Sequence, residues 1–208
     1  MPLLAVLVLL LFSGCHESVN HVELAIGRNV IILDPAGRPC CSGVLLSPRY
    51  VLTASHCVNA EPTVKIKWRN AAGDEKIIRA TVLYADPDQE STDLAILELD
   101  EPIEYPDAVL YSGRSPPRML ELIFAVGNPH GVIDYTASDG KVVYVDRKTN
   151  VGTYDQISCI IFRGNSGGGV YTYNGELVGI IVRGGSLSHT YMIPARTIRE
   201  WMTDYSLD

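Results

Sequence analysis

The chain has 208 residues and a formal net charge of −7, and 47% of its residues are hydrophobic while 20% are charged. This composition excludes a disordered tail and a bundle of membrane helices, and the length suits one domain or two small ones. The cations are scattered: Lys65, Lys67 and Arg69 alternate along the sequence, as on the solvent face of a strand. A nucleic-acid-binding surface is therefore not expected.

The first fourteen residues, MPLLAVLVLLLFSG, are almost wholly apolar and end in small residues. The run is too short to span a bilayer and is typical of the core of a signal peptide. The segment LFSGC resembles the bacterial lipobox, whose cysteine is lipidated and becomes the mature N-terminus. We therefore expect an exported lipoprotein of the cell envelope, with a signal peptide over residues 1–14, lipidation at Cys15 and a polar tether over residues 15–22. The alternative is an ordinary signal peptide cut near Gly14, which would give a periplasmic or secreted protein.

From residue 23 onwards, short apolar or alternating runs are separated by turn signals. The expected strands lie at residues 29–34, 41–46, 50–54, 63–68, 76–85, 94–99, 122–127, 141–145, 157–162, 167–173, 177–182 and 190–194. Such short runs, rich in Val, Ile, Leu and Tyr, are typical of an all-β sandwich or barrel.

The last segment, PARTIREWMTDY, follows a different period. Ile198, Trp201, Met202 and Tyr205 fall at helical spacing, which predicts one C-terminal helix. The acidic, turn-rich stretch at residues 98–118 is suited to joining two sub-barrels. We expect one domain over residues 23–208, built from two sub-barrels that meet near residues 100–118.

Three separate stretches carry candidate catalytic residues. His56 follows the strand YVLTA, Asp93 stands at the head of the strand LAILEL, and Ser166 lies in the glycine-rich run RGNSGGG. Taken alone, each has a simpler interpretation: a histidine in the core or on the surface, a turn or cap aspartate, and a hairpin. Together they are the groups that amide hydrolysis by a serine requires, namely a base, a carboxylate that orients it, and a hydroxyl.

In the order LTASHC, DLAIL, GNSGG, these stretches resemble the chymotrypsin-fold, or trypsin-like, serine peptidases. The resemblance covers residues from about 25 to 204. It implies an all-β fold of two packed six-stranded antiparallel barrels with the active site between them. It also implies that His56 is the general base and then acid, Asp93 its orienting partner and Ser166 the nucleophile, while the amides of Gly164 and Ser166 form the oxyanion hole.

Within that family the chain is most similar to the bacterial HtrA-like branch. FAVGNPHG resembles the strand and turn AIGNPFG of that branch, and GELVGIIV followed by YMIP is similar to its closing strands. The resemblance implies a serine endopeptidase that cleaves protein or peptide substrates through an acyl-enzyme and needs no metal or organic cofactor. The usual C-terminal PDZ domain is not expected. The alternative function is a catalytically inactive peptide-binding or chaperone-like protein on the same scaffold.

Two residues near the candidate nucleophile depart from the family pattern. Asn165 stands where trypsin-type enzymes carry an aspartate that pairs with a newly cut N-terminus, so activation by such an ion pair is not expected. Gly169 replaces the proline that usually follows GNSGG, which would loosen the strand after Ser166.

The resemblance also matches Cys41 and Cys57 to the family's disulfide beside the histidine. Neighbouring residues on a strand point to opposite faces, so Cys40 is not expected to share a partner with Cys41. Cys40 and Cys159 either form a second bridge or remain two free thiols. No zinc-binding spacing is present, so no metal site is expected.

By the family's register, residues 158–162, 181–185 and 188–191 line the primary specificity pocket. The candidate lining residues are Ile160, Ile161, Arg163, Ile181, Arg183 and His189. The two isoleucines favour a small or medium apolar substrate side chain, whereas Arg163 and His189 favour an acidic one. No acidic residue occupies the pocket base, where trypsin-like enzymes bind Lys or Arg.

Overall fold

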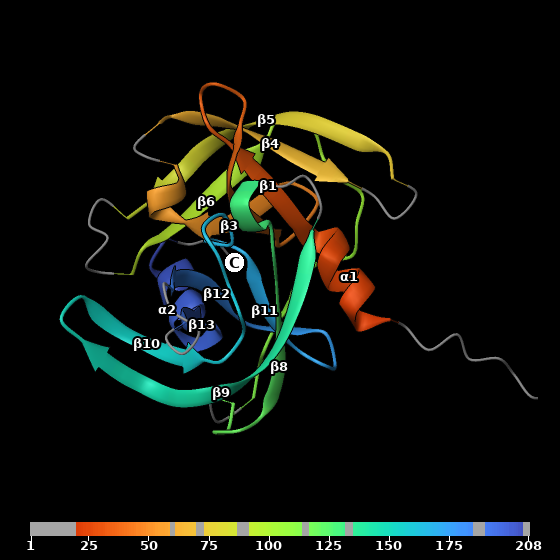
Figure 1. Ribbon diagram of the computed structural model, residues 1–208. Helices are drawn as coiled ribbons and strands as arrows, with labels where there is room; N and C mark the ends of the chain where they lie inside the picture. The colour runs from red at the N-terminus through yellow and green to blue at the C-terminus, as the bar shows by residue number, and fades with distance from the viewer. Residues whose placement is uncertain are drawn as a thin grey trace, which may run out of the picture.

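The computed structural model describes residues 20–58, 61–69, 73–86, 92–113, 117–131, 135–184 and 190–205. The predicted signal peptide, Cys15 and His189 lie outside these ranges. Within them, no helix combines the length and the apolar character needed to cross a membrane. The described chain is built mainly of β-strands (Figure 1).

The N-terminal half forms a closed six-stranded antiparallel barrel in the strand order β1-β2-β3-β6-β5-β4. Its strands are β1 (Asn29–Leu33), β2 (Pro39–Leu45), β3 (Tyr50–Ala54), β4 (Thr63–Arg69), β5 (Glu75–Ala85) and β6 (Leu94–Leu99). The pairing of β1 with β4 closes the ring. The apolar residues of β3 and β6, which alternate little in sequence, are almost all buried in the core.

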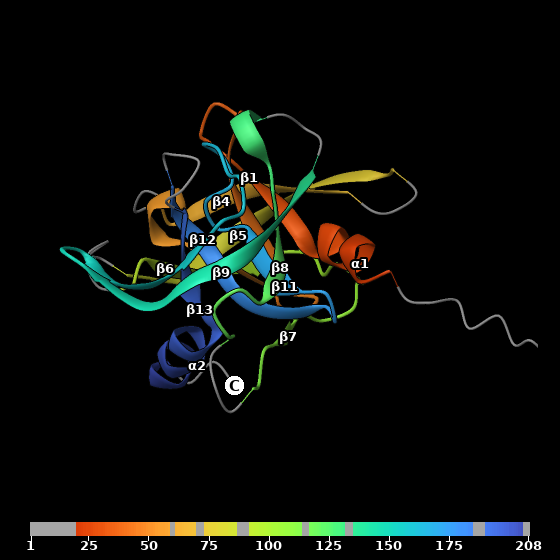
Figure 2. The ribbon, with the colours of Figure 1, turned by 60° about the horizontal axis from the view of Figure 1, so that its bottom comes forward.

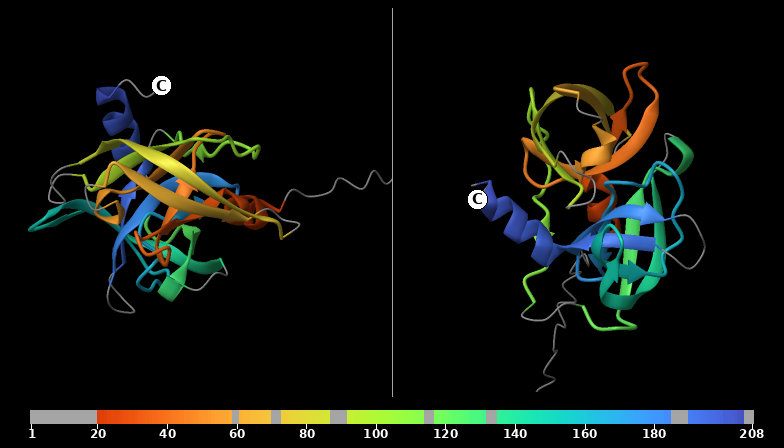
Figure 3. Two further views of the ribbon diagram at one scale, coloured as in Figure 1. Left: turned by 90° about the horizontal axis from the view of Figure 1, so that it is seen from above. Right: turned by 90° about the vertical axis from the view of Figure 1, so that its left-hand side faces the viewer.

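The C-terminal half forms the second barrel, which follows the strand order β11-β8-β9-β10-β13-β12 and closes through β11 and β12. Its strands are β8 (Leu122–Gly127), β9 (Thr136–Thr149), β10 (Gly152–Ile157), β11 (Gly169–Thr172), β12 (Glu176–Gly184) and β13 (Thr190–Pro194). A short strand, β7 (Val109–Leu110), adds to β12 in parallel. The right-hand view of Figure 3 shows the two barrels one above the other. The prediction of two six-stranded antiparallel barrels is confirmed.

Two helices flank the barrels on different sides (Figure 2). The predicted C-terminal helix is confirmed as α2 (Ala195–Asp204), which buries Ile198 and Trp201. Helix α1 (His21–Arg28) was not expected and includes the last two residues of the predicted tether. Asn20 caps it by accepting hydrogen bonds from two N–H groups of the first turn, and the indole N–H of Trp68 donates to Gly27 at 2.7 Å.

The strand predicted at residues 157–162 is wrong beyond its first residue. β10 ends at Ile157, and residues 158–162 run as an irregular segment. Hydrogen bonds hold this segment along β9: the N–H of Ser158 donates to the Lys141 carbonyl, and the N–H of Ile160 donates to the Ser138 hydroxyl. The apolar run therefore leads from the barrel into the loop that carries Ser166.

Candidate active site

His56 and Asp93 are brought together by two neighbouring strands. β3 ends at Ala54, and a single 3-10 turn, η1 (Ser55–Cys57), carries His56; Asp93 directly precedes β6. Ala54 pairs with Leu94 across the sheet, so the two side chains emerge at the same end of the barrel. Nδ1 of His56 lies 2.8 Å from Oδ2 of Asp93. This contact holds the imidazole by Nδ1 and leaves Nε2 as its other nitrogen.

The carboxylate of Asp93 is buried and surrounded by donors. Its side chain is 3% exposed, against 28% for that of His56. Oδ1 accepts hydrogen bonds from the hydroxyl of Ser55 at 2.8 Å and from the backbone N–H of His56 at 3.0 Å. The backbone of Asp93 has φ 53°, a left-handed conformation that aspartate tolerates better than most residues. These contacts fix the orientation of the carboxylate.

Ser166 lies across the barrel interface, next to the turn that carries His56. Its carbonyl oxygen accepts a hydrogen bond from the N–H of Ser42 at 2.8 Å and lies 3.6 Å from Sγ of Cys57. In the described part of the chain, neither Oγ of Ser166 nor Nε2 of His56 makes a hydrogen bond. The structure thus joins His56 to Asp93 by hydrogen bonds and brings Ser166 beside them without a hydrogen bond to the imidazole.

The loop around Ser166 leaves two amides unused. Among the described residues, the N–H groups of Gly164 and Ser166 donate no hydrogen bond, whereas those of Asn165, Gly167 and Gly168 all do. Two unbonded amides two residues apart can bind one anionic oxygen.

Gly164 is required at its position for two reasons. Its φ is +102°, a backbone conformation that side chains with a Cβ rarely adopt. A Cβ there would also lie 2.3 Å from the carbonyl oxygen of Asn128. The free amide next to Ser166 therefore depends on a glycine.

Two residues missed from the sequence hold this loop, Ser42 and His130. The N–H of His130 donates to the Arg163 carbonyl at 2.6 Å, and its ring packs on Phe162 with centroids 4.8 Å apart. His130 belongs to the 3-10 turn η2 (Pro129–Gly131) and has φ 58°. The sequence showed the turn GNPHG as part of the family resemblance, but nothing in it pointed to the backbone N–H of His130.

The predicted pocket residues divide by burial. Ile160 is 48% exposed, Arg163 is exposed and Arg183 is half-buried. The side chain of Ile161 packs against β12 at Gly184, where an added Cβ would meet it at 2.4 Å. Ile181 is fully buried in the core of the second barrel and so presents no surface to a substrate.

The disulfide between Cys41 and Cys57 is present, as expected. Cys40 and Cys159 are separate free thiols, so the alternative of a second bridge is wrong. Cys159 lies in the core of the second barrel, where burial raises the pKa of its thiol to about 12. Burial also raises the pKa of the Cys40 thiol.

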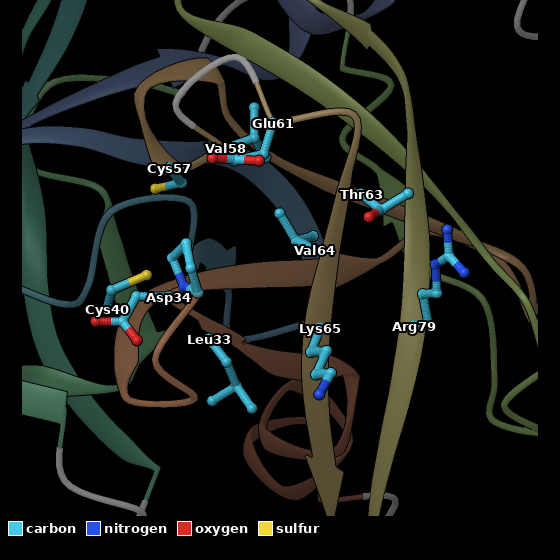
Figure 4. A pocket seen from close by; sticks show the side chains of 11 residues that line it. Leu33, Asp34, Cys40, Cys57, Val58, Glu61, Thr63, Val64, Lys65 and Arg79 are labelled. Carbon is cyan, nitrogen blue, oxygen red and sulfur yellow. The ribbon is translucent and has the colours of Figure 1, made fainter.

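Cys40 and Cys57 lie on the same wall of a pocket of about 370 Å³ in the first barrel (Figure 4). The other lining residues are Leu33, Asp34, Pro35, Val58, Glu61, Thr63, Val64, Lys65 and Arg79. Within the described ranges, the only three possible metal ligands that cluster are Cys41, His56 and Cys57. Both of these sulfurs are in the disulfide, so they cannot bind a metal as thiolates.

The comparisons with known proteins concern the family and the fold. Residues 41–180 match the family described as trypsin-like peptidase domain. A probable periplasmic serine endoprotease, DegP-like, from Brucella suis is 30% identical over 174 residues, which are 78% of this chain and 32% of the relative. The periplasmic pH-dependent serine endoprotease DegQ of Escherichia coli is 30% identical over 178 residues, which are 79% of this chain and 37% of the relative. The chain thus spans about a third of the length of these curated relatives.

A solved structure shows the same fold. The MamO protease domain from Magnetospirillum magneticum, in its apo form, superposes with a TM-score of 0.71 at 20% identity, covering 86% of this chain and 98% of that one. With the family match over most of the chain and two barrels that meet at His56, Asp93 and Ser166, the chain belongs to the trypsin-like peptidase domain family.

Proposed function

We propose that this chain is a serine endopeptidase that hydrolyses peptide bonds of proteins through an acyl-enzyme on Ser166. The observation that carries the proposal is the 2.8 Å contact between Nδ1 of His56 and the buried carboxylate of Asp93. A carboxylate in this place keeps the imidazole proton on Nδ1, so that Nε2 can act as a base.

In the proposed reaction, Nε2 of His56 takes the proton of the Ser166 hydroxyl as Oγ attacks the substrate carbonyl. The negative oxygen that develops is bound by the amides of Gly164 and Ser166, which are free to donate. His56 then gives its proton to the leaving amine, and a water molecule, activated by the same nitrogen, releases the acyl group. Asp93 remains ionised throughout and stabilises the imidazolium.

The proposal includes export. The relatives from Brucella suis and Escherichia coli are named periplasmic serine endoproteases, and the apolar leader with LFSGC suits a lipid anchor at Cys15. The anchor is tested by expressing the full chain and its Cys15→Ser variant and separating membrane from soluble fractions. The anchor predicts that the wild type is in the membrane fraction and the variant is not; a variant that stays with the membrane contradicts lipidation at Cys15.

The activity is tested with an unfolded protein as substrate. Purified wild type should release new N-termini from reduced, alkylated casein, and Ser166→Ala should release none while it still binds the substrate. Binding without cleavage by the wild type would contradict the proposal and favour the peptide-binding alternative.

A further inference from the structure

Ser42 joins the first barrel to the second through three hydrogen bonds, two with the loop of Ser166 and one with Asn128. It lies on β2 and is fully buried. Its N–H donates to the Ser166 carbonyl at 2.8 Å, and its hydroxyl donates to the Gly164 carbonyl at 2.8 Å. The same hydroxyl oxygen accepts from the N–H of Asn128 at 2.9 Å. One small side chain thus bonds to two other segments, both from the second barrel.

The directions of the carbonyls in the loop decide which of its amides stay free. In a trans peptide the carbonyl and the N–H point opposite ways, so fixing one fixes the other. The Arg163 carbonyl accepts from His130, which turns the amide of Gly164 away from η2. The Asn165 carbonyl accepts from Gly168, which turns the amide of Ser166 away from that turn. The direction of each free amide is thereby fixed by the hydrogen-bonded carbonyl of its own peptide unit.

The remaining two carbonyls of the loop, those of Gly164 and Ser166, are held by Ser42. Gly164 sits between these fixed points, and glycine has the widest backbone freedom of any residue. Without the bond to its carbonyl, the peptide unit that follows Gly164 can rotate, and the amide of Gly164 is then held from one side only, by the bond from His130 to the Arg163 carbonyl. The hydroxyl of Ser42 also orders Asn128, whose carbonyl contacts Gly164 from the other side.

We propose that Ser42 is a positioning residue that keeps the two free amides aimed at one point, and this inference rests on the proposed function. It touches no substrate; it acts through the Gly164 carbonyl. Its loss should therefore impair the transition state, in which the oxygen is charged, and leave ground-state binding of the substrate nearly unchanged.

The test compares Ser42→Ala with wild type on a peptide substrate, at a temperature where unfolding curves show both to be folded. We expect kcat to fall about 10- to 100-fold with KM within about twofold. That is less than the 10²–10³-fold lost when an oxyanion donor is removed, because the amide remains and only its direction loosens. The affinity for a peptide trifluoromethyl ketone, which forms the tetrahedral adduct, should fall by the same factor as kcat/KM.

Two further variants separate positioning from stability. Thr53→Val removes another buried hydroxyl, which donates to the Ser42 carbonyl at 2.8 Å, and should lower stability with kcat unchanged. Ser42→Thr keeps the hydroxyl and should restore most of kcat. If Ser42→Ala does not fold, Ser42→Gly removes the same hydroxyl.

The inference is overturned if the folded variant without the hydroxyl keeps kcat and inhibitor affinity within twofold of wild type, or if Thr53→Val loses as much kcat. A wild type that cleaves no substrate overturns the proposed function instead, so the two failures are distinguishable.

Discussion

Asp93→Asn is expected to remove nearly all activity while the fold remains. Besides its 3.1 Å contact with Nδ1 of His56, Oδ1 of Asp93 accepts from two donors, the hydroxyl of Ser55 and the backbone N–H of His56. An asparagine must keep its oxygen at this position, because an NH₂ group there would face both donors. The NH₂ group therefore takes the place of Oδ2, which lies 2.8 Å from Nδ1 of His56.

That amide donates to Nδ1 and forces the imidazole proton onto Nε2, where it blocks proton transfer from Ser166. In serine peptidases with this triad the same error of tautomer lowers kcat by about 10⁴-fold. At about 1.4 kcal/mol per factor of ten, the loss corresponds to roughly 5.5 kcal/mol of transition-state stabilisation. The assay is kcat/KM on a peptide substrate, together with the rate of labelling by a fluorophosphonate.

Asp86→Asn is the matched control for this substitution. The Asp86 carboxylate also accepts several hydrogen bonds, from the Thr92 hydroxyl, the Leu94 N–H and the Trp201 indole. Unlike Asp93, it has no hydrogen bond with His56 among the described residues. It should lower the unfolding temperature with little change in kcat. The reasoning is refuted if Asp93→Asn keeps kcat/KM within tenfold of wild type.

Three further substitutions or modifications have defined outcomes. Ser55→Ala removes one of the two donors to Oδ1 of Asp93 and should lower kcat/KM about tenfold, since a hydrogen bond to a charged group is worth about 1.5–3 kcal/mol; an unchanged value would mean that the His56 N–H suffices. Gly164→Ala places a Cβ 2.3 Å from the Asn128 carbonyl and should lower kcat by about 10²-fold or more, measured on folded protein; near-normal kcat would contradict the proposed oxyanion site. Burial raises the pKa of the Cys40 and Cys159 thiols above the ordinary value of 9.0, so both stay protonated at pH 7.5 and should resist iodoacetamide in the native state. Peptide mass spectrometry of the alkylated protein checks this. Cys40 should react first as the pH rises, and Cys159 only on unfolding. Rapid native labelling of Cys159 would place it outside the core.

Most strands could be predicted from the sequence because they are short, apolar and bounded by turn residues, whereas β7 and residues 152–156 of β10 were not expected. β3 and β6 carry His56 and Asp93 at adjacent ends, and their positions were evident from YVLTA and LAILEL. The segment at 158–162 was mistaken for a strand because its composition is apolar, although it leaves the barrel to enter the Ser166 loop. Helix α1 was missed because eight residues are too few to show a helical repeat; the structure holds it by the Asn20 cap and by the hydrogen bond from the Trp68 indole to Gly27.

The candidate catalytic residues were found by residue type and order, whereas the residues that orient them were not. Ser42 and Ser55 look like ordinary polar residues of a strand and a turn, and their partners are distant in the sequence. His130 acts through its backbone N–H, which no sequence pattern distinguishes. Hydrogen bonds between the two barrels depend on how the barrels pack, and single-sequence reasoning does not reach that level.

The central claim, that Ser166 is an activated nucleophile, is tested most directly by mapping a covalent adduct. Purified folded chain is treated with a fluorophosphonate and digested, and the peptides are analysed by mass spectrometry. The proposal predicts one adduct, on Ser166, which is absent in Ser166→Ala and strongly slowed in His56→Ala. Folded wild type that forms no adduct, or forms it on another serine, would contradict the proposal.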